Sequence, residues 1–223
     1  MKYSNIVQGT FISRPNRFIA IVNIDGIQQT VHVKNTGRCK ELLVPGCTVF
    51  LEKSSNPNRK TRYDLISVIK GERVINMDSQ APNIVFAEWI AKQFPEVYIK
   101  KEKTYRDSRF DCYMENGDDK VFTEVKGVTL EEDGHVRFPD APTERGIKHI
   151  HGLIDAVKNG YKGQIFFVIQ MENVKSFSPN YDTHPRFGAA LKEAEAAGVK
   201  ILAYSCRVTP DSLEIDKPVP VIL

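Results

Sequence analysis

The spacing of apolar residues changes once along this chain, near residues 76–83. Before that point, apolar and polar residues alternate in short runs, two of which are separated by an Asp25-Gly26 pair. Alternation of this kind is typical of half-buried strands, and Asp-Gly favours a tight hairpin turn. After that point, apolar residues also recur at helical spacing. We therefore predict a two-domain α/β (α+β) protein, divided into residues 1–80 and 81–223.

Residues 1–80 predict an all-β domain. Four runs alternate clearly, at residues 18–24, 27–33, 46–54 and 62–71, and no helical stripe of useful length occurs among them. Five or so strands in so short a segment predict a small closed or partly closed barrel, and an OB-like topology fits that number of strands. A small β-sandwich is the alternative.

Residues 81–223 predict a mixture of helices and strands. The segments with an apolar stripe at helical spacing are residues 84–94, 143–159 and 184–198. The segments rich in β-branched and aromatic residues are residues 97–103, 109–114, 120–128, 163–171 and 199–208. Their order along the chain is α-β-β-β-α-β-α-β.

The composition, with 41% hydrophobic and 26% charged residues, is that of ordinary globular proteins. The N-terminal segment lacks the apolar region of a secretory signal, and no apolar run approaches the ~18 to 20 residues of a membrane helix. Four scattered cysteines form no CxxC pair, which argues against a zinc module or a disulfide framework. We expect a cytoplasmic protein with no membrane partner. A homodimer is one of the oligomeric states that the sequence leaves open.

Positive charge is concentrated in the first domain. Residues 1–80 contain 12 Lys and Arg against 6 Asp and Glu, whereas residues 81–223 contain 19 against 22. A local excess of cations indicates a polyanionic partner, although a solvated basic face is the alternative. We expect salt-sensitive binding to the DNA backbone, with RNA as a second candidate. The predicted contact residues of this domain are Arg14, Arg38, Lys40 and Arg59.

Three charged residues stand on two neighbouring strands of the second domain. Glu124 and Lys126 are two apart and therefore share one face of their strand, and Asp111 lies across the predicted turn. Two carboxylates on one face repel each other unless a cation lies between them, which predicts a Mg²⁺ or Mn²⁺ site. Lys126 could orient a water or stabilise developing charge. Glu88, on the preceding helix, is a further candidate ligand. A cross-strand salt bridge is the alternative.

This order of elements resembles the core of the PD-(D/E)xK nuclease superfamily. The resemblance implies that Asp111 and Glu124 bind metal, that Lys126 is the catalytic lysine, and that Glu88 is the optional helix carboxylate. Phe110 stands where the superfamily's name has a proline.

A second resemblance covers nearly the whole chain. Four motifs in the same order look like the SfsA family of sugar fermentation stimulation proteins: NTGRCKELLVPG at 35–46, EVKGVTL at 124–130, FPDAPTERGIKHI at 138–150 and HPRFGAAL at 184–191. The family implies an N-terminal OB-like domain, a C-terminal nuclease-like domain, DNA binding and a link to the regulation of sugar metabolism, notably of maltose.

Arg145 and His149 lie four residues apart on one face of a predicted helix. With the family resemblance, we expect them to contact a phosphate beside the metal. The resulting hypothesis is a DNA-binding protein with a metal-dependent nuclease domain that hydrolyses phosphodiester bonds. The alternative is a non-enzymatic DNA-binding regulator of sugar (maltose) metabolism genes that retains the nuclease scaffold.

Overall fold

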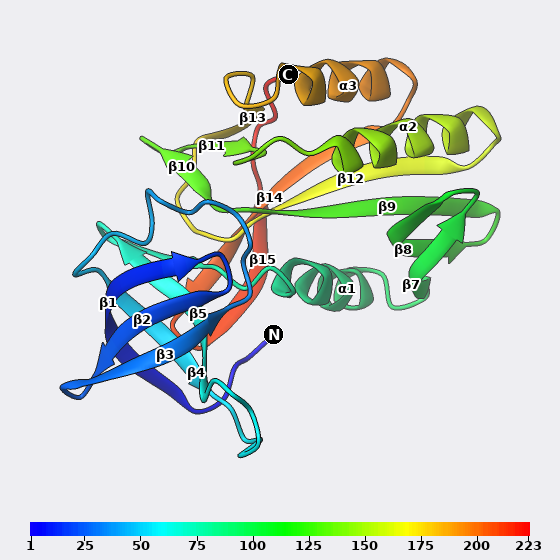
Figure 1. Cartoon of the computed structure of the whole chain (residues 1–223). Helices are drawn as coiled ribbons and strands as arrows, with labels where there is room; N and C mark the ends of the chain where they lie inside the picture. Colours follow the sequence, from blue (N-terminus) through cyan, green and yellow to red (C-terminus); the bar gives the residue numbers. More distant parts are fainter.

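The computed structural model describes all 223 residues and contains two six-stranded sheets and one three-stranded sheet. The first sheet belongs to the N-terminal domain and lies beside the larger second domain (Figure 1). No helix of the structure is long and apolar enough to cross a membrane.

The N-terminal domain is a closed barrel. Its strands are β1 (Ile6–Asn16), β2 (Ile19–Ile24), β3 (Ile27–Val33), β4 (Thr48–Lys53), β5 (Tyr63–Lys70) and β6 (Arg73–Asn76). They pair in the order β3-β2-β1-β4-β5-β6, and a parallel pairing of β3 with β5 closes the barrel. Alternate residues such as Val22, Val31, Val49 and Leu51 fill its core. The predicted OB-like barrel is therefore confirmed.

Strand β1 was not predicted, although it pairs with both β2 and β4. The register of its pairing with β2 shifts between Phe11 and Ser13 and again between Ser13 and Asn16. Such bulges insert residues without a partner, so the alternation of apolar residues is lost along the strand.

The second domain is built around a mixed six-stranded sheet. Its elements are α1 (Ala81–Gln93), β7 (Tyr98–Tyr105), β8 (Ser108–Asn116), β9 (Asp119–Val128), β10 (Leu130–Glu132), β11 (His135–Phe138), α2 (Glu144–Lys158), β12 (Lys162–Ile169), β13 (Ser176–Pro179), α3 (Pro185–Ala196), β14 (Lys200–Thr209) and β15 (Ser212–Pro218). The large sheet has the order β15-β14-β12-β9-β8-β7, with β9, β12 and β14 parallel.

Helices cover both faces of this sheet, with α1 on one side and α2 and α3 on the other (Figure 1). Alternate residues of β12 show this arrangement: Phe166 packs in one apolar cluster with Phe86 of α1, whereas Phe167 packs in the other with Leu153 of α2. The three predicted helices and five predicted strands are all present. Besides β1, the unpredicted strands are β6 of the barrel and β10, β11, β13 and β15 of the second domain. Most are short, and β11 and β13 pair only because the fold brings distant segments together.

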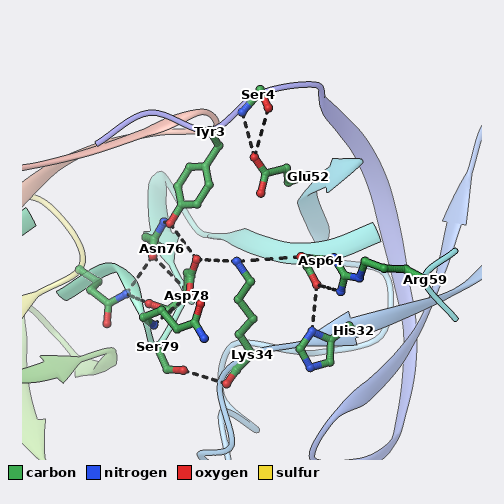
Figure 2. Close-up of polar contacts among 12 residues, drawn as sticks. Tyr3, Ser4, His32, Lys34, Glu52, Arg59, Asp64, Asn76, Asp78 and Ser79 are labelled. Carbon is green, nitrogen blue, oxygen red and sulfur yellow. Dashed lines mark hydrogen bonds and ion pairs between the residues drawn. The ribbon is translucent and has the colours of Figure 1, made fainter. Parts of the chain in front are cut away.

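A buried polar network joins the two domains (Figure 2). The Lys34 ammonium lies 2.9 Å from Asp78 Oδ2 and 4.0 Å from Asp64 Oδ2. Asn76 donates to the Tyr3 hydroxyl, and Gln170 of the second domain donates to Asn76 Oδ1 at 2.8 Å. Because buried polar groups must keep their partners, this network fixes how the barrel sits on the second domain.

A second connection between the domains is ionic. Glu131 of β10 has a side chain that is only 2% exposed, and it accepts hydrogen bonds from Lys70 at 2.8 Å, from Arg73 at 2.7 Å and from the Gly134 amide at 2.6 Å. Burial alone would raise the pKa of Glu131, but the hydrogen bonds from Lys70 and Gly134 outweigh it and hold the pKa below its usual range. The carboxylate therefore stays charged between the domains.

Candidate functional site

Asp111 lies where strands β8 and β9 stop pairing. Their ladder runs from Asn116–Asp119 to Cys112–Thr123 and does not continue to Asp111. Instead, the Asp111 carboxylate accepts a hydrogen bond from the Val125 amide at 2.9 Å. Burial, and after it the negative charge of Glu124, raises the pKa of Asp111. The local structure therefore places a carboxylate where its charge is unfavourable.

Asn83 of α1 also reaches this carboxylate, donating to Asp111 Oδ1 at 3.0 Å. The sequence offered no signal for Asn83, which lies 28 residues away from Asp111 along the chain. Its contact depends on how α1 packs against the sheet.

Glu124 of β9 has a buried carboxylate, and two neighbouring side chains donate hydrogen bonds to the same oxygen. The side chain of Lys126 and Nδ1 of His149 both donate to Oε1. Glu124 is 3% exposed, and its other oxygen, Oε2, is buried without any hydrogen-bond partner. Burial alone would raise the pKa of Glu124, but the His149 hydrogen bond and the Lys126 charge hold it below its usual range. A charged carboxylate thus keeps one oxygen unsatisfied.

These groups fit a hard divalent cation. The unbonded Glu124 oxygen and the repulsion between Asp111 and Glu124 are two unfavourable features that one bound cation would remove. No group of three or more His, Cys, Asp or Glu side chains in the chain is placed to hold a metal. An ion here would therefore complete its coordination with water or substrate oxygens, as Mg²⁺ commonly does at phosphate-processing sites.

The structure does not bring Glu88 together with Asp111 and Glu124, and its carboxylate pairs elsewhere. Glu88 Oε2 lies 2.6 Å from the amino group of Met1, which also donates to the Leu213 carbonyl. Asn83 and Glu88 are five residues apart on α1, so they project from different sides of the helix. Helix α1 therefore contributes the side-chain amide of Asn83 to the site, whereas its Glu88 binds the amino group of Met1.

The structure separates the predicted roles of Arg145 and His149. Thr143 caps α2 by accepting a hydrogen bond from the Gly146 amide at 3.0 Å. His149, one turn into the helix, is buried and directs Nδ1 at Glu124. Arg145 is exposed and makes no ion pair, so it is free to contact an anion.

Two of the four predicted cations of the barrel, Arg14 and Arg59, make hydrogen bonds within the protein. Arg14 donates to four backbone carbonyls, those of Arg17, Asn35, Gly37 and Arg38. Arg59 forms a two-pronged pair with Asp64 at 2.8 and 2.7 Å. Arg38 and Lys40 are exposed without an ion pair and remain available.

The loop that carries Arg38 is attached to the second domain. The Arg38 amide donates to Asp140 Oδ2 at 2.8 Å, and a Cβ on Gly37 would lie 2.3 Å from the same oxygen. Asp140 therefore holds this loop of the barrel. Glycine at position 37 is therefore required by the close approach of the carboxylate.

Gly37→Ala is expected to lower the melting temperature by about 2 to 6 °C, because the added methyl group displaces Asp140 and the overpacking costs about 1 to 2 kcal/mol. Thermal denaturation followed by circular dichroism measures the effect. Thr36→Ala, in the same loop and exposed, is the matched control and should leave the melting temperature unchanged. Equal melting temperatures for Gly37→Ala and the wild type would show that the contact is dispensable.

Comparison with known proteins covers the whole chain. Residues 12–77 match the family described as the SfsA N-terminal OB domain, and residues 80–212 match the sugar fermentation stimulation protein RE domain. A sugar fermentation stimulation protein homolog from Desulfitobacterium hafniense (strain Y51) is 59% identical over 216 residues, which are 96% of this chain and 95% of that protein. One from Clostridium beijerinckii is 57% identical over 226 residues and covers 100% of both chains.

A solved structure has the same fold. The structure of Pyrococcus furiosus SfsA in complex with Ca²⁺ superposes with a TM-score of 0.91 at 28% sequence identity, covering 100% of this chain and 98% of the other. The agreement in both sequence and fold confirms the resemblance predicted from the four motifs, including the OB-like barrel followed by a restriction-endonuclease-like domain.

Proposed function

Because the chain belongs to the SfsA family, we propose that it is a DNA-binding protein whose second domain hydrolyses phosphodiester bonds with a bound Mg²⁺ or Mn²⁺. The observation that carries the proposal is the unbonded Oε2 of Glu124, buried in a site that already contains a second, electrostatically coupled carboxylate. A carboxylate oxygen left buried without a partner is costly unless a ligand completes it. The described complex of the Pyrococcus relative with Ca²⁺, another cation with oxygen ligands, supports a divalent ion.

In the proposed mechanism, Asp111 and Glu124 would hold the ion, which would supply Lewis-acid polarisation of a phosphoryl oxygen and a more acidic water. The Lys126 ammonium lies beside Glu124 and stabilises negative charge that develops on the phosphorus oxygens in the transition state. His149 acts through Glu124, whose carboxylate it orients by a hydrogen bond from Nδ1. Arg145, exposed near the start of the same helix, binds a neighbouring phosphate of the substrate.

The second candidate is a DNA-binding regulator without catalysis. The observation in its favour is that no group of three or more acidic, imidazole or thiol side chains is placed to hold a metal ion. Such a regulator would bind DNA but leave it intact in Mg²⁺ or Mn²⁺. We favour the enzyme, because DNA binding alone does not require a lysine paired with a buried carboxylate in the second domain.

All four cysteines are free thiols, three of them buried. Thiols that persist unpaired fit a reducing compartment, so we place the proposed activity in the cytoplasm.

Asp111→Asn tests the metal centre directly. Without metal, the variant is expected to melt about 2 °C or more above the wild type, because it removes a partly buried charge and its repulsion from Glu124. With saturating Mn²⁺ the order should reverse, since at about 100 times the dissociation constant a bound ion stabilises the wild type by about 3 kcal/mol. Differential scanning calorimetry with and without Mn²⁺, together with cleavage of labelled single- and double-stranded DNA and RNA, measures both effects.

Asp118→Asn is the matched control for this experiment, because Asp118 is exposed at the turn between β8 and β9. It should bind Mn²⁺ and cleave as the wild type does. If the wild type gains no stability from Mn²⁺, Mg²⁺ or Ca²⁺, the metal centre is refuted. Metal binding without cleavage of any nucleic acid would favour the regulator.

A further inference from the structure

A groove runs between the barrel and the second domain. One cavity is lined by residues of the barrel, among them Arg17, Arg38 and Lys40, and also by Ala141 of the second domain. A neighbouring cavity shares Arg17 and Ala141 with the first and extends to Arg137 and Gly127. The shared lining residues place the two cavities side by side at the boundary between the domains, and we call them together the groove.

The groove is strongly basic. Arg17, Arg38 and Lys40 are exposed and form no ion pair. Arg137 faces only the exposed acids Glu132 and Asp182, each at 3.7 Å. Asp140 is an acidic group in the lining, and it already accepts the Arg38 amide. Uncompensated cations along a channel are the surface that a phosphate backbone recognises.

The second cavity reaches β9 at Gly127, in the strand that carries Glu124 and Lys126. Gly127, which lines the groove, directly follows Lys126 on β9 and is two residues beyond Val125, whose amide binds Asp111. A Cβ at Gly127 would lie 2.5 Å from Gln170 Oε1 and 2.7 Å from Pro82 Cγ, so glycine lets the chain pass close to its neighbours there. A nucleic-acid strand lying in the groove would therefore run from the barrel toward Lys126.

A large aromatic residue directly follows the groove residue Arg17. Phe18 follows Arg17 in the turn between β1 and β2, and its side chain is 51% exposed although it is large and apolar. Its backbone is held in place, because its amide donates to Asn16 Oδ1 and its carbonyl accepts from the Val33 amide. An exposed aromatic ring next to cations is the kind of surface on which unpaired bases stack. Bases inside a duplex are already stacked on their neighbours and do not offer a free face.

We propose that this groove binds single-stranded DNA, with one base stacked on Phe18, its phosphates on Arg17, Arg38 and Arg137, and the strand directed toward Lys126. The inference rests on the proposed nuclease function, because it states that single-stranded DNA is the form of the substrate that reaches the site. Its binding statement is independent of cleavage. The proposed contact residues therefore include Arg17, Phe18 and Arg137. They do not include Arg14 and Arg59, which make hydrogen bonds within the protein.

Fluorescence anisotropy in EDTA tests the binding without cleavage, using labelled oligo(dT), oligo(U) and a mixed-sequence duplex of equal length. The wild type is expected to bind oligo(dT) more tightly than the duplex. Phe18→Ala should weaken oligo(dT) binding about tenfold and leave duplex binding unchanged, because only an unpaired base stacks on the ring. Phe18→Trp should restore the affinity, and Phe18→Leu, which keeps the apolar bulk, should not.

Charge is tested in the same assay. Arg17→Ala and Arg137→Ala should each weaken oligo(dT) binding and reduce its dependence on salt between about 50 and 200 mM. Lys60→Ala, an exposed cation in the loop between β4 and β5, is the matched control and should bind as the wild type does. All of these side chains are at least partly exposed, so the variants are expected to fold, and their melting curves verify this.

Several outcomes would overturn the inference: tighter binding to duplex than to oligo(dT), unchanged oligo(dT) affinity in Phe18→Ala, tighter binding to oligo(U) than to oligo(dT), or equal losses for Lys60→Ala and Arg17→Ala. Failure of cleavage in Mn²⁺ with the expected binding pattern refutes the nuclease and leaves the groove assignment intact. Cleavage in Mn²⁺ with none of the expected binding differences refutes the groove assignment and leaves the nuclease proposal intact.

Discussion

Lys126→Ala is expected to slow metal-dependent phosphodiester cleavage by about 100- to 1,000-fold, the range found when one charge-stabilising donor is removed from an active site. Lys126 is held beside Glu124, and its side chain is 21% exposed, so its ammonium can reach a substrate while it remains oriented. Alanine at this position removes the positive charge but neither carboxylate. Initial rates on labelled DNA at saturating Mn²⁺ measure the effect.

Metal binding separates this prediction from that for Asp111→Asn. Isothermal titration calorimetry should show that Lys126→Ala still binds Mn²⁺, whereas Asp111→Asn does not. Lys120→Ala, an exposed lysine on the same strand, is the matched control and should retain full activity. Lys126→Arg, which keeps the charge, should recover part of the rate. A Lys126→Ala variant that cleaves as fast as the wild type would remove this lysine from the mechanism.

Glu131→Ala is expected to reduce the free energy of unfolding by about 3 kcal/mol, because breaking a buried ion pair leaves the partner charges without a counter-charge. The substitution leaves Lys70 and Arg73 without their carboxylate and the Gly134 amide without its acceptor. The same residues join the barrel to the second domain. The melting temperature should therefore fall by about 6 to 12 °C.

The neighbouring Glu132 provides the control for this measurement. Its side chain is 73% exposed and lies 3.7 Å from Arg137, so Glu132→Ala should change the melting temperature very little. Urea denaturation followed by tryptophan fluorescence checks the free energies, since the single tryptophan, Trp89, packs in the second domain against Phe166 and Tyr204. Equal stability of Glu131→Ala and Glu132→Ala would show that the ionic connection contributes nothing.

Much of the architecture could be predicted because it depends on short-range patterns. The Asp25-Gly26 turn, the apolar stripe of α2 and the continuous apolar run of β12 each arise from neighbouring residues. The proximity of Asp111, Glu124 and Lys126 was predicted for the same reason, since a hairpin turn fixes which residues of β8 and β9 lie near each other.

The partners of these residues could not be predicted in the same way. Asn83 and His149 reach the carboxylates from two helices on opposite faces of the sheet, 28 and 25 residues away along the chain. The residues around Glu88 contained no sign that the amino group of Met1 would bind its carboxylate. The sequence did not distinguish Arg14 and Arg59 from Arg38. In the structure, Arg14 donates to backbone carbonyls and Arg59 pairs with Asp64.

The sequence by itself determined two domains, the main helices and strands, the family, and the hairpin that carries two acids and a lysine. Only the tertiary structure decided which charges are available, where the N-terminus binds, and that Phe18 stands exposed beside a basic groove. The physical reason is range: hydrophobic periodicity and turn chemistry act between residues close in sequence. Burial, ion pairing and exposure depend on packing between segments that are distant in the chain.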